Sequence, residues 1–320
     1  MRVLKSLLAP ALLAALLAGL PGCGGSSSRV EAYVPTGLVA FGDELSLIDT
    51  SGRKYTVNAL KTGTTDLDCA TYPVWPQVVA DGYGMVFKEC NPKAVATTAA
   101  VMKASVGAKV ADVVAAVAAY QATAVFTPQT LVTVMAGQHD ILAAYYAYSA
   151  GTLTRAQAKA QVAAAGKTLG ALVNTVANQG SGARVLYATP PNLGYSPFAA
   201  EQVRTTGNAD RAVLLKELTL DFTAGLRLEV TNDGRYAALI TADELTITMS
   251  DTTKLQVNGL TNVVDAVCTV ALPGCTTATM VSGAAGLGTA YLWADAQHPG
   301  VNYQVRTGIA ALNRARNNPF

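Results

Sequence analysis

The chain has 320 residues, of which 51% are hydrophobic and 14% are charged, so it has ample apolar material for a large core and is not typical of a disordered protein. Its length suits one α/β domain or two small ones. The formal net charge is +2 and Lys and Arg form no dense cluster, so nothing electrostatic supports a nucleic-acid partner.

The first 22 residues have the pattern of an export signal. Arg2 and Lys5 precede an apolar stretch at residues 7–20, which is too short to span a bilayer as a stable helix. The following Leu20-Pro21-Gly22-Cys23 resembles a bacterial lipobox, in which the Cys thiol is lipidated and becomes the new N-terminus. We therefore expect a lipoprotein signal peptide at 1–22 and a lipidated Cys23 with a flexible tether at 23–34.

This interpretation predicts a bacterial cell-envelope protein held on a membrane by its N-terminal lipid. Gly24, directly after the Cys, indicates the outer membrane by family analogy. The alternative is an ordinary secretory signal in which Cys23 is incidental.

Apolar runs and helix-start signals predict that strands alternate with helices. Buried strands are expected at residues 37–41, 130–135, 184–189 and 236–240, and helices at 94–120, 154–178, 208–228 and 303–316. Thr154-Arg155-Ala156-Gln157 matches a helix capping box. Residues 51–93 are rich in Gly, Thr and Pro and are expected to be irregular.

This alternation predicts an α/β fold with a parallel sheet covered by helices on both faces. Ligands of such sheets bind at the carboxyl ends of the strands. The candidate site is therefore expected at residues 42–46, at residues 137–140 and in the loop before the last helix. The sequence contains no P-loop and no GxGxxG motif.

Four Cys remain if Cys23 carries lipid, and an even number in an exported chain suggests disulfides. Three connectivities are possible. The local choice pairs Cys69 with Cys90 and Cys268 with Cys275, each pair closing a modest loop. No CxxC or Cys/His spacing suggests a zinc site.

Three blocks of the sequence resemble the GDSL/SGNH family of ester hydrolases. They are similar to the family's Gly-Asp-Ser-Leu-Ser, Gly-x-Asn-Asp and Asp-x-x-His-Pro motifs, and they read Gly42-Asp43-Glu44-Leu45-Ser46, Gly137-Gln138-His139-Asp140 and Asp295-Ala296-Gln297-His298-Pro299. Residues 258–268 look like the segment before the last block in the lysophospholipase and autotransporter-esterase branch. The resemblance covers roughly residues 35–315, so residues 35–320 are expected to form one SGNH/GDSL-like domain. It implies a three-layer α/β/α fold of the flavodoxin-like SGNH kind with a central parallel sheet, and no cofactor.

The resemblance also implies roles for single residues. His298 matches the family's catalytic base and Asp295 the residue that orients it. Glu44 stands where the family has its nucleophilic Ser, and His139 stands where it has the Asn of the oxyanion hole. The Gly that supplies an oxyanion N–H should follow the second strand, and residues 85–106 contain none. Gly137, Asp43 and Asp140 are expected to line the site.

Alternatives remain for three of these positions. Ser46 matches the family's second Ser and is either a substitute nucleophile or a Ser that bonds backbone at a helix start. Glu44 is either a nucleophile or general base, or the partner of His298 in an ion pair that keeps the imidazole protonated. Glu44, His139, His298 and Asp295 form either a hydrogen-bond network, which we favour, or a metal site.

These residues predict a non-hydrolytic or strongly impaired relative of the esterases, which binds an ester, acyl, glycan or protein ligand in the former esterase cleft. The alternative is an active carboxylic-ester hydrolase that uses Glu44 or Ser46 with His298 and Asp295.

Overall fold

The computed structural model describes residues 33–178, 180–231, 234–284, 288–317 and 320. These belong to one structural unit, Ala32–Phe320. The signal peptide, the Cys23 lipidation site and nearly all of the tether lie outside the described residues, so the anchor stays a prediction.

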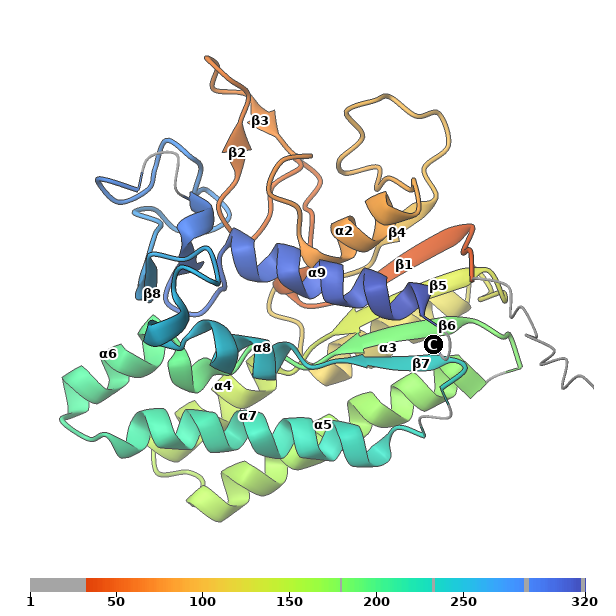
Figure 1. Ribbon diagram of the computed structural model, residues 1–320. Helices are drawn as coiled ribbons and strands as arrows, with labels where there is room; N and C mark the ends of the chain where they lie inside the picture. Colours follow the sequence, from red (N-terminus) through yellow and green to blue (C-terminus); the bar gives the residue numbers. More distant parts are fainter. Residues whose placement is uncertain (1–32, 179, 232–233, 285–287, 318–319) are drawn as a thin grey trace, which may run out of the picture. The chain divides into compact units, whose positions relative to one another are not determined.

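Five parallel strands form the main sheet in the spatial order β4-β1-β5-β6-β7 (Figure 1). Along the chain they are β1 (Gly37–Gly42), β4 (Ala100–Met102), β5 (Thr130–Met135), β6 (Arg184–Ala188) and β7 (Ala237–Ile240). Numbered within this sheet, the order is 2-1-3-4-5, which is the flavodoxin-like order of doubly wound folds. The predicted parallel sheet and four of its strands are confirmed, and β4 was not expected.

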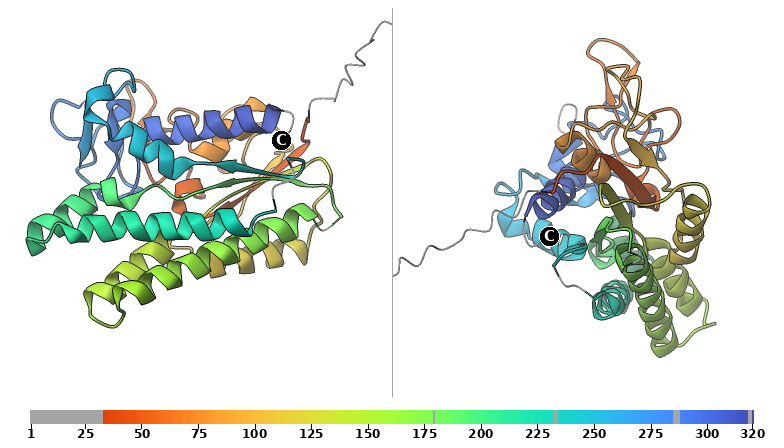
Figure 2. Two further views of the ribbon diagram at one scale, coloured as in Figure 1. Left: turned by 60° about the horizontal axis from the view of Figure 1, so that its bottom comes forward. Right: turned by 90° about the vertical axis from the view of Figure 1, so that its right-hand side faces the viewer.

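Helices cover both faces of this sheet, as Figures 1 and 2 show. One layer contains α3 (Val110–Gln121), α4 (Gln138–Ser149), α5 (Arg155–Asn178), α6 (Pro197–Thr206) and α7 (Asp210–Glu229). The other contains α2 (Trp75–Gly82), α8 (Ala242–Met249) and α9 (Val301–Arg316). The predicted three-layer α/β/α fold is therefore confirmed.

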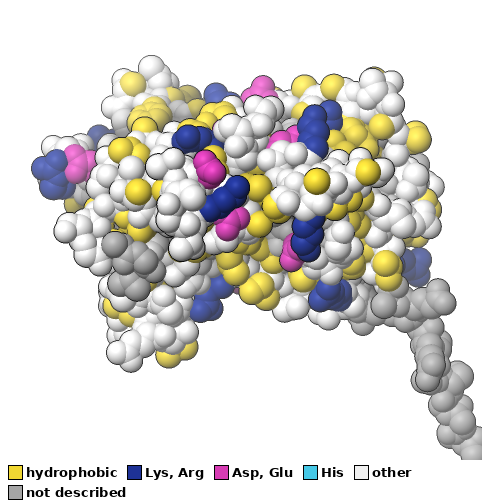
Figure 3. All heavy atoms as spheres, turned by 90° about the horizontal axis from the view of Figure 1, so that it is seen from above, with side chains coloured by type: hydrophobic (Ala, Val, Ile, Leu, Met, Phe, Trp, Pro, Cys, Tyr) yellow, Lys and Arg dark blue, Asp and Glu magenta, His cyan; other side chains and the backbone are white. Residues whose placement is uncertain are grey.

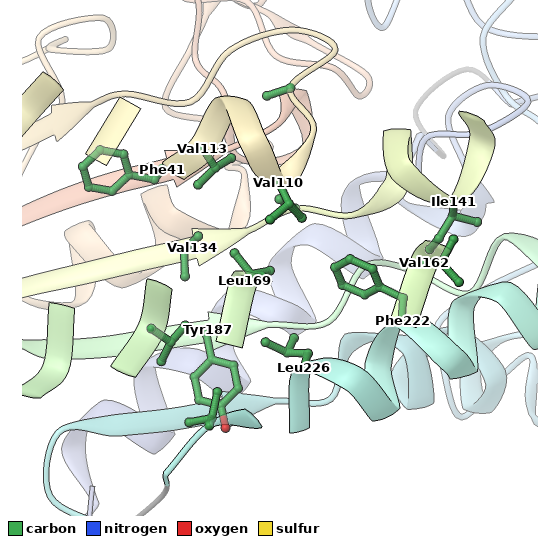
Figure 4. Packing of buried hydrophobic residues seen from close by; sticks show 14 of the residues in the cluster. Phe41, Val110, Val113, Val134, Ile141, Val162, Leu169, Tyr187, Phe222 and Leu226 are labelled. Atoms are coloured by element: carbon green, nitrogen blue, oxygen red, sulfur yellow. The ribbon is translucent and has the colours of Figure 1, made fainter. Parts of the chain in front are cut away.

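The larger apolar core lies between the sheet and the layer of α3, α5 and α7 (Figure 4). Phe41, Val134 and Tyr187 from neighbouring strands contact helix side chains such as Leu169 and Phe222, and all five are almost completely buried. Burying a side chain of this size stabilises a fold by roughly 1.5–3 kcal/mol. The alternation of strand residues also builds a second core against α2 and α9.

Irregular segments outside the main sheet contain the two disulfides. They carry the two-stranded pairs β2 (Ala59–Leu60) with β3 (Leu67–Asp68), and β8 (Asn262–Ala266) with β9 (Tyr291–Trp293). Cys69 bonds Cys90 and Cys268 bonds Cys275, so the predicted local pairing is confirmed.

Two sequence-based expectations were wrong in part. Residues 94–109 were expected to be helical, but they contain β4, and α3 begins only at Val110. The Ala/Val-rich composition suits either state, and a three-residue strand leaves no usable periodicity. Residues 51–93 are not irregular throughout, because α2 begins at Trp75, with Pro76 in its first turn, where Pro is tolerated. The capping box is confirmed, since the Thr154 side chain and backbone exchange hydrogen bonds with Gln157.

The surface gives little further indication of a partner. Figure 3 shows Lys and Arg side chains dispersed among acidic and hydrophobic ones on the face of the molecule that is uppermost in Figure 1. Among the described residues, no helix is both long enough and apolar enough to cross a membrane.

Candidate active site

The site lies where β1 and β5 end, and two glycines let these strands turn there. Gly42 has φ +139°, and a Cβ at this position would lie 2.1 Å from the Met135 carbonyl oxygen. Gly137 has φ +118°, and a Cβ there would lie 2.3 Å from the Phe222 ring. Only glycine fits both positions. As a result, the short 3₁₀ helix η1 (Glu44–Ser46) and the first turn of α4 carry Glu44 and His139 to the same edge of the sheet.

The Glu44 carboxylate has three hydrogen-bond partners. Its Oε1 lies 2.6 Å from Nε2 of His139 and 3.0 Å from Nε2 of His298, and its Oε2 accepts the Gly107 N–H at 2.8 Å. The Glu44 side chain is only 3% exposed. The structure thus brings Glu44 between the two imidazoles, as the sequence suggested, and binds both carboxylate oxygens.

His298 is held between two carboxylates. Its Nδ1 lies 2.9 Å from each Asp295 carboxylate oxygen, while its Nε2 faces Glu44. Asp295 is itself fixed, because its Oδ1 accepts the backbone N–H groups of Gln297 and His298. A neutral imidazole has one N–H, so donating to both ionised carboxylates requires the cation.

Gly107 is the functional residue that the sequence reasoning missed. Residues 85–106 contain no glycine, and Gly107 follows directly, in a stretch expected to be helical. In the structure this stretch is a loop between β4 and α3, and Gly107 has φ +73°. The conclusion that no glycine donor exists is therefore wrong, since the Gly107 N–H points at the side chain of residue 44. A lone Gly in an Ala/Val-rich run was the available signal of a break.

The electrostatics follow from these contacts. Burial alone would raise the pKa of Glu44, but the hydrogen bonds from both imidazoles and from Gly107 outweigh it and hold the pKa well below its usual range. Burial would lower the pKa of His298, but Asp295 and Glu44 together raise it to about 9. The hydrogen bond to Glu44 also raises the pKa of His139. At neutral pH the cluster is therefore an ion-pair network.

Asp43 and Ser46, the other polar side chains in the block of Glu44, are fully buried. Ser46 Oγ accepts the indole N–H of Trp75 at 3.0 Å. Asp43 Oδ1 accepts the Leu45 N–H at 3.1 Å, whereas its Oδ2 has no partner among the described residues. Burial, and then the charge of Glu44, raise the pKa of Asp43 to about 7.

Asp140 and Tyr55 complete the surroundings. Asp140 Oδ2 accepts the Val110 N–H at 3.0 Å, so it links the start of α4 to the start of α3, just after the Gly107 loop. The Tyr55 ring lies 5.9 Å from the His298 ring, centroid to centroid. Asp140 thus helps position the loop that binds Glu44, and Tyr55 forms an aromatic wall beside the imidazole.

A metal ion would need several ligands aimed at one empty point. In the described part of the chain, no group of three or more His, Cys, Asp and Glu side chains has such an arrangement. Both Nε2 atoms instead lie at hydrogen-bond distance from the same Glu44 oxygen. The geometry is that of a hydrogen-bond network.

No family model and no curated protein matches the chain. Among solved structures, it is similar to an extracellular lipase from Streptomyces rimosus, with 17% identity, a TM-score of 0.44 and coverage of 88% of this chain and 99% of that one. It is also similar to a lipase from a goat rumen metagenome (10%, 0.48, 88% and 99%) and to phospholipase A1 from Streptomyces albidoflavus (13%, 0.44, 88% and 100%).

Proposed function

We propose that the protein is a non-hydrolytic or strongly impaired relative of the GDSL/SGNH ester hydrolases, which binds a ligand or partner at the Glu44 site. The observation that carries this proposal is the state of Glu44. Its carboxylate accepts a hydrogen bond from one backbone N–H and lies at hydrogen-bond distance from two imidazoles. An esterase of this design needs these same groups for its substrate.

Ester hydrolysis by the family mechanism would need an activated hydroxyl and a neutral base. Position 44 has no hydroxyl, and the Ser46 hydroxyl is fully buried and bonded by Trp75. His298 is protonated between two carboxylates and cannot accept a proton. The low pKa of Glu44 also makes its carboxylate a weak nucleophile and a weak base.

A ligand can still reach the rim of the site. The side chain of Asp295 is 30% exposed and that of His139 is 23% exposed, whereas that of Glu44 is nearly covered. A bound ester, acyl, glycan or protein group would therefore meet His139 and the Tyr55 ring before it met the carboxylate.

A second candidate function is residual ester hydrolysis with altered machinery. The specific observation in its favour is that the Asp295–His298 pair and the Gly107 N–H both converge on residue 44. In this version the Glu44 carboxylate, with His298 beside it, is the nucleophile or the general base that attacks the ester or activates water.

Fluorophosphonate labelling and hydrolysis of short p-nitrophenyl esters distinguish the two. Wild type should be neither labelled nor active. Glu44→Ser should gain labelling because His298, Asp295 and Gly107 are in place, and Glu44→Ser combined with His298→Ala should lose it again. Wild-type activity that disappears in both Glu44→Ala and His298→Ala would favour the second candidate, and stoichiometric labelling of Ser46 would contradict the first.

We further propose that a lipid on Cys23 anchors the protein to the outer membrane of a bacterial cell. The sequence motif alone supports this. Fractionation of wild type and Cys23→Ala tests it, because two or three acyl chains hold a protein on a membrane stably. Equal membrane retention of the two proteins would contradict the anchor.

A further inference from the structure

The edge of the main sheet at β7 differs from the edge at β4. At β4 the backbone is covered, because Ala100 donates to the Val86 carbonyl and pairs with Phe87. At β7 the backbone groups of the even-numbered residues bond to the neighbouring strand β6. Val185 donates to the Tyr236 carbonyl, and Thr189 donates to the Ile240 carbonyl. In a parallel ladder the groups of the odd-numbered residues then point away from the sheet.

At Leu239 the outward backbone groups of this edge are accessible. Ala237 is only 2% exposed, so its outward groups are shielded, whereas Leu239 is partly exposed. Within the part of the chain that the structure describes, nothing bonds the outward N–H and C=O of Leu239. An unpaired strand edge is a template for another extended segment.

A groove of about 370 Å³ lies beside Leu239. Its walls come from β7, α8 and α9, and it is lined by residues such as Leu239, Leu245, Arg306, Ala310 and Arg314. The last three are spaced four apart on α9 and therefore share one helix face. Figures 1 and 2 show β7 at the border of the sheet, with α9 on one side of it and α7 on the other.

The charge beside the groove is positive. Glu244, which also lines it, is paired with Arg227 of α7 at 3.0 Å. Arg306 is held by Asn302 and by the Asn258 carbonyl, and Arg314 has no hydrogen-bond partner for its side chain among the described residues. The two guanidinium groups of α9 thus face the groove without a carboxylate of their own.

We propose that this groove binds a short extended peptide with acidic side chains, which adds to the sheet beside β7. The peptide backbone would exchange hydrogen bonds with the N–H and C=O of Leu239, as in β-strand addition. Its apolar side chains would contact Leu245 and Ala310, and its carboxylates would pair with Arg306 and Arg314. This surface is independent of the Glu44 site.

The test titrates a fluorescently labelled Glu-Val-Glu-Val-Glu peptide with the full-length protein and measures the anisotropy of the label. We expect saturable binding of this peptide. Two matched peptides should fail to bind, namely Lys-Val-Lys-Val-Lys and a Glu-Val-Glu-Val-Glu peptide with N-methylated valines, which cannot donate its alternate amides. These controls leave the protein unchanged, so a folding defect cannot imitate them.

Protein variants localise the contact. Leu239→Pro removes an N–H that points away from β6, so it should weaken binding by at least about tenfold without breaking the ladder. Arg314→Glu should weaken binding about as much, since it places like charges together. Lys167→Glu, which changes an exposed cation on α5, should leave binding unchanged.

Three results would overturn the proposal. The first is no saturable binding of the acidic peptide to wild type. The second is equal binding by wild type and a folded Leu239→Pro variant. The third is a wild-type dimer in sedimentation that Leu239→Pro dissociates, because the occupant of the edge would then be a second copy of this chain.

Discussion

Two regions of the molecule bury a charge, and each charge has three partners. In the site, Glu44 is bound by His139, His298 and the Gly107 N–H. In the irregular region above the strands, the fully buried Lys54 donates to the carbonyl oxygens of Cys69, Thr71 and Tyr72 at 2.8–3.0 Å. The numbers of contacts are the same, but the partners differ in kind.

The difference lies in what the partners can do. Backbone carbonyls carry no net charge and cannot titrate, so burial dominates at Lys54 and lowers its pKa to about 7. The partners of Glu44 include two imidazoles that gain a proton beside it, and its pKa falls instead. Lys54 therefore ties three backbone carbonyls together but holds its own proton weakly, whereas the two imidazoles beside Glu44 hold their protons more tightly than free imidazoles do.

The largest expected effect is the loss of the Lys54 tie. Lys54→Met keeps most of the stem but leaves three carbonyl oxygens without a donor, so the free energy of unfolding should fall by about 3–4 kcal/mol. Urea denaturation measures this. Lys61→Met, an exposed lysine of the same region, is the matched control and should change little. Equal stability of both variants would show that the carbonyls find other partners.

The two disulfides should contribute unequally to the same region. Cys69–Cys90 spans 21 residues and Cys268–Cys275 spans 7. Loop-closure entropy then assigns about 3 kcal/mol to the first and about 2 kcal/mol to the second. Denaturation of the two paired Cys→Ser variants checks the order, and a larger loss for the shorter loop would contradict the entropic account.

The sheet and its long helices could be predicted because their signals are local. The buried runs that became β1, β5 and β6 end within two residues of a Gly or Pro, and α5 begins at a capping box. The region around Lys54 could not be predicted, because its order comes from contacts between distant segments. Asn58, for example, donates to the carbonyls of Pro273 and Cys275.

The side chains of the site could be predicted from the sequence, but the backbone N–H of Gly107 and the contacts that hold the side chains in place could not. The blocks around Glu44 and His139 follow β1 and β5, whose carboxyl ends lie together in the parallel sheet, and the His298 block lies in the loop between β9 and α9. Gly107 contributes through its backbone N–H, which leaves no side-chain signature, and the three-residue β4 before it was hidden in an Ala-rich run. The ties from Asp140 to Val110 and from Ser46 to Trp75 depend on packing that no spacing reveals.

The charge of Glu44 gives the next largest effect, and it depends on pH. The folded pKa of His298 is raised to about 9 from roughly 6.5 in the unfolded chain, so the stability from its pairing is complete below about pH 6.5. This stability is lost as the pH rises through about 9. Glu44→Gln should therefore cost about 2 kcal/mol at about pH 6 and clearly less at about pH 9.5.

Melting curves of Glu44→Gln across that range, with and without chelator, provide the measurement. Glu229→Gln, an exposed carboxylate at the end of α7, should show no such trend. A metal held by the same groups would need neutral imidazoles, so it predicts the opposite pH trend and a chelator effect. If Glu44→Gln melts like wild type at every pH, the ion-pair network contributes nothing to the fold.

The smallest expected effect concerns Asp43, the buried carboxyl beside Glu44. Its folded pKa is raised to about 7 from roughly 3.9 in the unfolded chain, so the folded state holds the proton more tightly. The contribution of Asp43 to wild-type stability should then decrease as the pH rises from about 4 to about 7, and stay constant above that. Asp43→Asn keeps the oxygen that accepts the Leu45 N–H and cannot ionise. Relative to wild type it should gain about 1 kcal/mol between about pH 5 and about pH 6, which urea denaturation at both pH values resolves. Asp81→Asn, an exposed carboxylate on α2, should show no gain. A constant difference between Asp43→Asn and wild type would mean that Asp43 is ionised throughout, and that the imidazoles compensate two adjacent carboxylates rather than Glu44 alone.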